Sequence, residues 1–249
     1  MLWPKIQDPQ QWVIWFDLDD TLWDFRNNSM ETLEEVHRHF MLGTLWPDVK
    51  EWKHDYHLVN DAMWEQLARG EISQSELRWR RFYDTFVNKG MAEAQSRLLA
   101  PQADMYYLQK LGERENLLPG AADTLSYLKN RGFKIGILSN GFRDVQYNKM
   151  KSGGIDGFID FVVLSDEIGI TKPDEGIYRY AEQVAGVSVE HCIMVGDNSD
   201  TDIAGCLNAG WALGVWMNPS GKAPGPKLCS CLSRQCALQV IESLSVIRF

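Results

Sequence analysis

The sequence predicts an α/β protein built on a parallel sheet, with a helical bundle inserted after the first strand. Three observations indicate this fold class. An apolar run rich in aromatic and β-branched residues at 12–16 is typical of a buried strand. Helical spacing of apolar residues then continues for roughly 90 residues. From position 118 to position 216, short apolar runs alternate with helical segments, as in strands joined by helical crossovers.

The expected elements follow in chain order. Four helices are predicted in the inserted segment, at 29–40, 59–69, 74–88 and 91–111. The second region should alternate between helix and strand, at 121–131, 133–138, 143–151, 161–164, 175–185, 192–195, 203–209 and 212–216. Residues 219–236 are predicted to form a loop, and a last strand and helix are expected within 239–247. We therefore expect a core domain of residues 1–23 and 117–249 and a helical domain of residues 24–116.

Composition limits the classes of partner. The chain has 249 residues, with 34 acidic and 25 basic side chains and a formal charge of −9. Such a charge argues against a nucleic acid polymer or an anionic membrane as the main partner. No apolar run reaches the ~18–20 residues that span a bilayer, and the first residues lack the pattern of a secretory signal. We expect a soluble, cytoplasmic protein.

The five cysteines do not form a common metal pattern. Cys192 and Cys206 lie in apolar stretches typical of buried thiols. Cys229, Cys231 and Cys236 cluster near the end of the chain, but their spacing does not match the usual zinc sites. Reduced thiols are the simpler interpretation, and the role of this cluster is left unassigned.

Polar residues follow three of the predicted strands. They form the segments 17–21, 139–140 and 197–202. Ligands of open parallel sheets bind at the carboxyl ends of the strands, so all three segments should face one crevice. If the acids were only turn and helix-capping residues, their recurrence at separate strand ends would have no explanation.

The residue types at these strand ends suit phosphoryl transfer. Crowded carboxylates repel one another unless a cation neutralises them, and an oxygen-rich ligand set suits Mg²⁺. A carboxylate can attack phosphorus, and a second acid can protonate the leaving oxygen. Lys172 could stabilise both a carboxylate and a phosphoryl group, while Ser139 and Asn140 offer hydrogen-bond donors to phosphate oxygens.

These residues resemble the four ordered motifs of the haloacid dehalogenase (HAD) superfamily. The motifs correspond to 17–21 (Asp-Leu-Asp-Asp-Thr), Ser139-Asn140, Lys172-Pro173 and 196–202. The resemblance implies a Rossmann-like core, with the inserted helices as the family's cap domain. It covers the α/β part on both sides of that insertion.

The resemblance also implies roles for individual residues. Asp17 would be the nucleophile, and Asp19 would be the general acid and base and would lend its backbone carbonyl to Mg²⁺. Asp17, Asp19 and Asp197 would bind the metal. Leu18, Thr21, Ser139, Asn140 and Lys172 would surround the phosphoryl group, with Thr21 bracing the loop. Asp202 would orient Lys172 or metal-bound water, and Asn198 stands where many relatives have Ser, which leaves its role open.

An acid two residues after the nucleophile is typical of the phosphatases of this superfamily and is missing from its halide-releasing members. Asp19 therefore favours phosphate-ester hydrolysis. The segments 139–146 and 164–173 also resemble those of bacterial pyrimidine 5′-nucleotidases, so a nucleoside 5′-monophosphate is the expected substrate. Another small phosphorylated metabolite, such as a sugar phosphate, is the main alternative. A 2-haloacid dehalogenase, a phosphomutase and a non-enzymatic regulatory protein are weaker ones.

The helical domain is rich in aromatic side chains. Most of its tryptophans are expected to form its core, because a thin bundle needs large side chains. Trp23 and Phe25 directly follow the first motif and are equally consistent with contacting substrate or with packing. Arg78, Arg80 and Arg81 are expected on a solvated helix face.

Overall fold

The computed structural model describes residues 6–232 and 237–247. It divides the chain into two compact units, one made of residues 1–25 and 115–249 and the other of residues 26–114. These divisions lie within two residues of the boundaries expected from the sequence. In the described part of the chain, no helix combines the length and hydrophobicity needed to cross a bilayer.

The first unit contains a six-stranded parallel sheet with the strand order β3-β2-β1-β4-β5-β6. The strands are β1 (Val13–Phe16), β2 (Lys134–Ser139), β3 (Phe161–Leu164), β4 (Cys192–Gly196), β5 (Leu213–Met217) and β6 (Leu238–Ile241). The first strand in the sequence lies inside the sheet, between β2 and β4. All four residues of β1 are buried, which explains why this strand is continuously apolar rather than alternating.

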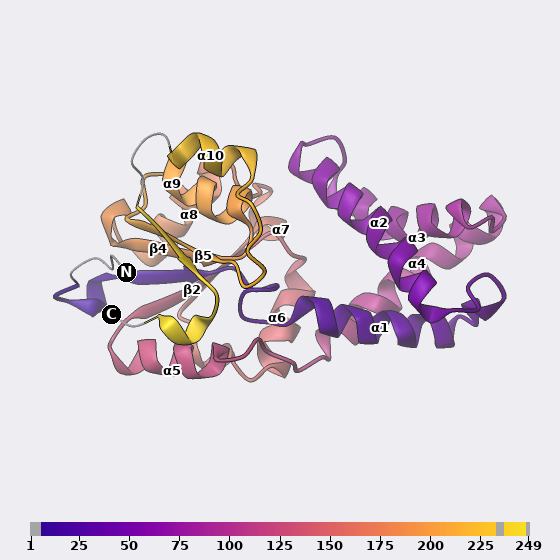
Figure 1. The fold of residues 1–249 in the computed structure, drawn as a ribbon, viewed down its shortest axis with the longest axis horizontal. Coiled ribbons are helices and arrows are strands. Elements are labelled where there is room, and N and C mark those ends of the chain that lie inside the picture. The colour runs from indigo at the N-terminus through magenta and orange to yellow at the C-terminus, as the bar shows by residue number, and fades with distance from the viewer. Residues whose placement is uncertain (1–5, 233–236, 248–249) are drawn as a thin grey trace. The chain divides into compact units, whose positions relative to one another are not determined.

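Helices cover both faces of this sheet. They are α5 (Ala121–Asn130), α6 (Arg143–Ser152), α7 (Ser165–Ile168), α8 (Glu175–Ala185), α9 (Ala204–Asn208) and α10 (Pro226–Leu232). Figure 1 shows α5 on one side of the sheet and α8 and α9 on the other. Trp15, Tyr178 and Cys206 are buried in the core between the sheet and the α8–α9 layer. This is the Rossmann-like α/β core expected from the sequence.

Two expectations about this unit need correction. Residues 219–236 were expected to form only a loop, but the described part of that segment contains α10. This helix is held by Asp200, whose carboxylate accepts from the N–H of Leu228 at 3.0 Å. Its support therefore comes from a residue 28 positions earlier in the chain. The single-turn helix α7, which directly follows β3, was not expected either.

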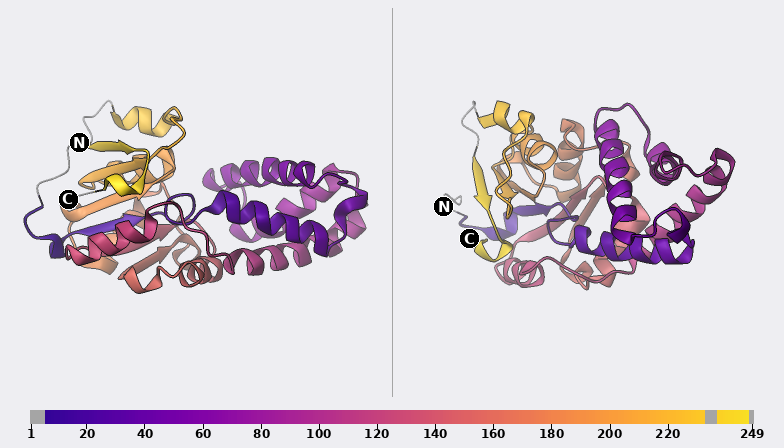
Figure 2. Two further views of the ribbon diagram at one scale, coloured as in Figure 1. Left: turned by 60° about the horizontal axis from the view of Figure 1, so that its bottom comes forward. Right: turned by 45° about the vertical axis from the view of Figure 1, so that its right-hand side comes forward.

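The second unit is a bundle of four long helices, seen side by side in Figure 2. They are α1 (Phe25–His39, which begins at the end of the first unit), α2 (Val49–Ala68), α3 (Gln74–Asn88) and α4 (Glu93–Gly112). The bounds of α3 match the expectation, because Ser73 and Glu76 form a capping box that fixes where the helix begins. Helix α2 begins ten residues before the expected 59, at a turn capped by Asp48.

Aromatic side chains fill the bundle core. Trp46 and Trp52 have no exposed surface, and their rings meet edge to face at 4.9 Å between centroids. The expectation of a solvated face is wrong for Arg81, which is 3% exposed and donates to the buried carboxylate of Asp104 at 2.7 Å. Arginine is tolerated at this buried position because that carboxylate neutralises its charge.

Candidate active site

The end of β1 places Asp17 between two neighbouring strand ends. Phe16 is in register with Ile137 of β2 and with Val195 of β4. The next residue, Asp17, donates its backbone N–H to the carbonyl of Val195 at 2.9 Å. Because β1 is an interior strand, the polar residues that follow β2 and β4 flank Asp17 on either side.

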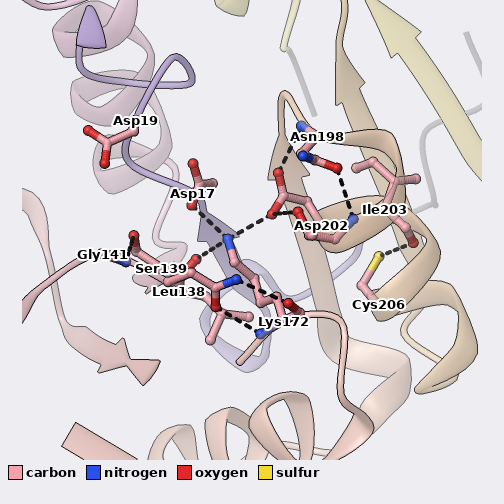
Figure 3. A network of polar contacts seen from close by, with 12 residues as sticks. Asp17, Asp19, Leu138, Ser139, Gly141, Lys172, Asn198, Asp202, Ile203 and Cys206 are labelled. Carbon is pink, nitrogen blue, oxygen red and sulfur yellow. Dashed lines mark hydrogen bonds and ion pairs between the residues drawn. The ribbon is translucent and has the colours of Figure 1, made fainter. Parts of the chain in front are cut away.

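The chain curls sharply after Asp17. The carbonyl of Leu18 accepts from the N–H groups of Leu22 and Trp23 at 3.0 and 2.9 Å, and Asp20 adopts a left-handed backbone conformation with φ of 56°. Thr21 is fully buried, and its hydroxyl has no hydrogen-bond partner among the described residues. The curl separates the Asp17 and Asp19 side chains, and Asp19 points away from the group around Lys172 in Figure 3.

Lys172 connects the first and last motifs. Its ammonium group is 2.6 Å from Asp17 Oδ1, 2.7 Å from Asp202 Oδ1 and 2.8 Å from the carbonyl of Leu138 (Figure 3). These three contacts use all three donors of the ammonium group. Lys172 is only 2% exposed, so its charge is held in place by acceptors from three strand ends rather than by water.

The second motif holds Lys172 in place. The side-chain amide of Asn140 donates to the carbonyl of Lys172 at 3.0 Å and accepts from its N–H at 2.8 Å. Ser139 Oγ accepts from the N–H of Gly141 at 3.1 Å. Both polar atoms of the Asn140 side-chain amide are thus hydrogen-bonded within the protein. We propose that the backbone N–H of Asn140 donates to a phosphoryl oxygen instead.

The loop after β4 carries two further acids of the site, Asp197 and Asp202, and Asn198 between them. Asn198 Oδ1 accepts from the N–H groups of Asp200 and Thr201, both at 3.0 Å, and its own N–H donates to Asp202 Oδ2 at 3.0 Å. Asn198 therefore shapes the turn that carries Asp202. Gly196 is needed at the start of this loop, because a Cβ there would lie 2.3 Å from Asp202 Oδ2.

Carboxylate oxygens of Asp17, Asp197 and Asp202 lie within 4.8 Å of one another. Such an all-oxygen donor set, buried at two of its three positions, fits a hard divalent cation such as Mg²⁺. Of the three predicted metal ligands, the structure brings together the side chains of Asp17 and Asp197. The Asp19 side chain lies outside this cluster, so its assignment to the metal depends on its backbone carbonyl.

Burial sets the protonation of this cluster. Desolvation raises the pKa of Asp17 to about 7, although the ammonium group of Lys172 opposes the shift. Desolvation, together with the negative charge of Asp202, raises the pKa of Asp197 to about 8. Burial alone would lower the pKa of Lys172, but the carboxylates of Asp17 and Asp202 outweigh it and raise that pKa above its ordinary value. The lysine therefore stays cationic, while Asp17 and Asp197 hold protons near neutral pH.

Binding of Mg²⁺ should therefore release protons. Near pH 6 the metal-free protein holds protons on Asp17 and Asp197, and a metal ion that these carboxylates bind must displace them. We expect about one to two protons per Mg²⁺ near pH 6, with affinity that rises as the pH passes through 7 and 8. Titration calorimetry in buffers of different ionisation enthalpy measures this number. A metal affinity independent of pH from 5.5 to 8.5 would contradict this assignment.

Two residues at the site were given no role from the sequence, although Gln146 ends the segment 139–146 that resembles the nucleotidases. Lys149 Nζ is 2.7 Å from Asp19 Oδ1, and Gln146 Nε2 is 3.1 Å from Asp19 Oδ2. The signal available was their spacing of three on the helix that follows Ser139-Asn140, which places both on one helix face.

The aromatic residues after the first motif have different exposure. Trp23 has no exposed surface, whereas Phe25 is half-buried. Lys149 Nζ lies over both rings, 4.5 and 5.3 Å from their centroids. Of the two, Phe25 therefore offers surface to a ligand, and a substrate contact there stays a prediction.

Comparison with known proteins identifies the class of enzyme. Residues 13–210 match the family model of the haloacid dehalogenase-like hydrolases, so the chain belongs to that family. It is 30% identical over 218 residues to the pyrimidine 5′-nucleotidase YjjG of Escherichia coli, with 85% of this chain and 90% of YjjG covered. It is 32% identical over 205 residues to the pyrimidine 5′-nucleotidase PynA of Streptococcus pneumoniae, with 82% of each chain covered. These relatives place the chain among the phosphatases of the family.

A solved structure supports the same fold. The putative HAD-hydrolase YfnB of Bacillus subtilis, which was crystallised with bound magnesium, superposes with a TM-score of 0.77 at 27% identity. The match covers 86% of this chain and 92% of YfnB.

Proposed function

We propose that this protein is a magnesium-dependent phosphomonoester hydrolase that works through a phosphorylated Asp17. The observation that carries the proposal is the buried cluster in which Lys172 contacts both Asp17 and Asp202. A nucleophilic carboxylate needs a fixed orientation and a nearby cation that also attracts the phosphoryl group, and Lys172 supplies both.

The chemistry divides into two displacements. An oxygen of Asp17 attacks phosphorus and forms an acyl phosphate, while the bond from phosphorus to the leaving oxygen breaks and Asp19 gives that oxygen a proton. Asp19 then takes a proton from water, which attacks the same phosphorus and releases inorganic phosphate from Asp17. Lys172 and the N–H groups of the second motif stabilise negative charge on the phosphoryl oxygens throughout.

Asp17, Asp197 and the backbone carbonyl of Asp19 would hold Mg²⁺. The ion would neutralise charge on the phosphoryl group and so let two anions approach each other. The carboxylate cluster described above and the magnesium bound in YfnB support this assignment.

For the substrate we propose a nucleoside 5′-monophosphate, as the names of YjjG and PynA suggest. A half-buried aromatic side chain such as Phe25 could contact the nucleoside. A sugar phosphate is the alternative, and a 2-haloacid dehalogenase is disfavoured by Asp19.

A phosphate-release screen tests both the phosphatase activity and the substrate class. We expect hydrolysis of nucleoside 5′-monophosphates that stops when EDTA removes the metal and returns when Mg²⁺ is added. Sugar phosphates and short phospho-acids in the same screen define the substrate class. Equal rates over all three sets would reject the nucleotide assignment, and no phosphate release from any of them would reject the phosphatase itself. Halide release from a 2-haloacid without Mg²⁺ would favour the dehalogenase alternative.

A further inference from the structure

The carboxylate of Asp19 is held by two side chains from one face of α6. Its two oxygens have separate partners, since Lys149 lies 2.7 Å from Oδ1 and Gln146 donates to Oδ2 at 3.1 Å. These partners lie 130 and 127 positions later in the chain than Asp19. Asp19 is thus fixed at both oxygens by an element remote in sequence.

Lys149 is almost fully buried and lies against aromatic rings. It is 3% exposed, and the faces of Trp23 and Phe25 cover its ammonium group. A buried cation against aromatic faces keeps few alternative positions and no shell of water. Its charge is therefore directed at Asp19 and is hardly available to ligands in solution.

Gln146 links Asp19 to the second motif. Its Nε2 group also contacts Ser139 Oγ at 2.7 Å, so one amide nitrogen connects the proposed general acid with a proposed phosphate-binding residue. The nitrogen is the atom that must face Asp19, because an amide oxygen there would repel the carboxylate. Gly141 makes room for this amide, since a Cβ at that position would lie 2.3 Å from Nε2.

We propose that Lys149 and Gln146 are positioning residues that aim the carboxylate of Asp19 at the leaving oxygen. Neither side chain needs to touch the substrate for this role. The inference depends on the proposed function, because it assumes that Asp19 transfers the proton in phosphate-ester cleavage.

Leaving groups of different basicity separate this role from a merely structural one. An alkoxide needs a proton as it departs, whereas p-nitrophenolate leaves as a stable anion. The value of kcat/KM reports the steps up to departure of the leaving group. It should be measured for Lys149→Met and Gln146→Leu with a nucleoside 5′-monophosphate and with p-nitrophenyl phosphate.

In both variants we expect kcat/KM for the alkyl ester to fall about 100-fold, within the range of general acid catalysis, and that for the aryl ester to fall less than about fivefold. In an Asp19→Asn background, Lys149→Met should cause no further loss with the aryl ester, because two residues that act as one unit are not additive. Lys129→Met is the matched control. Lys129 pairs with Asp160 at 2.7 Å, and this pair precedes the amino ends of β2 and β3, so neither ester should be affected.

Equal losses for the two esters would overturn the inference and leave the phosphatase proposal intact. So would a further loss on adding Lys149→Met to Asp19→Asn. If the wild-type protein cleaves neither ester, the proposed function fails and the inference fails with it. Thermal unfolding and the remaining aryl-ester activity show whether each variant has folded, and Gln146→Leu provides the test if Lys149→Met does not fold.

Discussion

Replacing Asp17 with asparagine should abolish turnover while leaving the protein folded. An amide cannot form the acyl phosphate, so we expect kcat to fall by at least ~10⁴-fold, as for other nucleophiles removed from a catalytic unit. The fold should survive, because asparagine has nearly the same volume and can still accept a hydrogen bond from Lys172. Phosphate release measures the first expectation, and circular dichroism with thermal unfolding measures the second.

A matched aspartate provides the control for this substitution. Asp160 also accepts from a lysine and from a backbone N–H, that of Ile135, but it precedes β3 at the amino edge of the sheet. Asp160→Asn should therefore keep its turnover within about twofold of the wild type, as is usual away from a reacting centre. Acid quenching of the wild-type reaction followed by mass spectrometry should locate phosphate on Asp17. Full turnover by Asp17→Asn would refute the assignment of the nucleophile.

Removing the charge of Lys172 should damage both catalysis and stability. Lys172→Met leaves Asp17 and Asp202 close together and without their shared cation. Loss of one partner from a buried ion pair costs about 3–5 kcal/mol, and we expect a decrease of about that size in the free energy of unfolding. Turnover should fall about 10³-fold, because the phosphoryl group also loses this positive charge.

The destabilisation by Lys172→Met should depend on pH. Asp17, whose pKa is raised to about 7, is mostly protonated near pH 5 and mostly ionised near pH 8.5 in the metal-free protein. The charge that Lys172 stabilises is therefore smaller at low pH, so the difference from wild type should shrink as the pH falls. Urea unfolding in EDTA at the two pH values measures it. A difference that is unchanged or larger at low pH would contradict this electrostatic explanation.

Several features of this protein could be predicted from the sequence because they depend on local patterns. Buried parallel strands need continuous apolar runs, and the run at 161–164 matches β3 in full. Helix α3 could be placed because its capping box is local. The meeting of Asp17 and Asp197 was also predictable, since polar residues at the ends of adjacent parallel strands share one edge of the sheet. Lys172 lies eight residues beyond the end of β3, and only the family resemblance placed it beside Asp17.

Other features were decided only by the tertiary structure. From the sequence, a solvated face of α3 was an acceptable position for Arg81. Only the packing of α4 against α3 brings the buried carboxylate of Asp104 to this arginine. Helix α10 depends on a hydrogen bond to Asp200, which no local pattern reveals.

The sequence by itself determined the alternation of strands and helices and the chemistry of the strand ends, because periodicity and residue type act over a few positions. The tertiary structure decided which side chains orient the catalytic groups at those strand ends. Lys149 and Gln146 reach Asp19 only because α6, which follows β2, lies beside the loop that follows β1. Such contacts join residues more than a hundred positions apart, and their free energy depends on distance and burial, which sequence spacing does not specify.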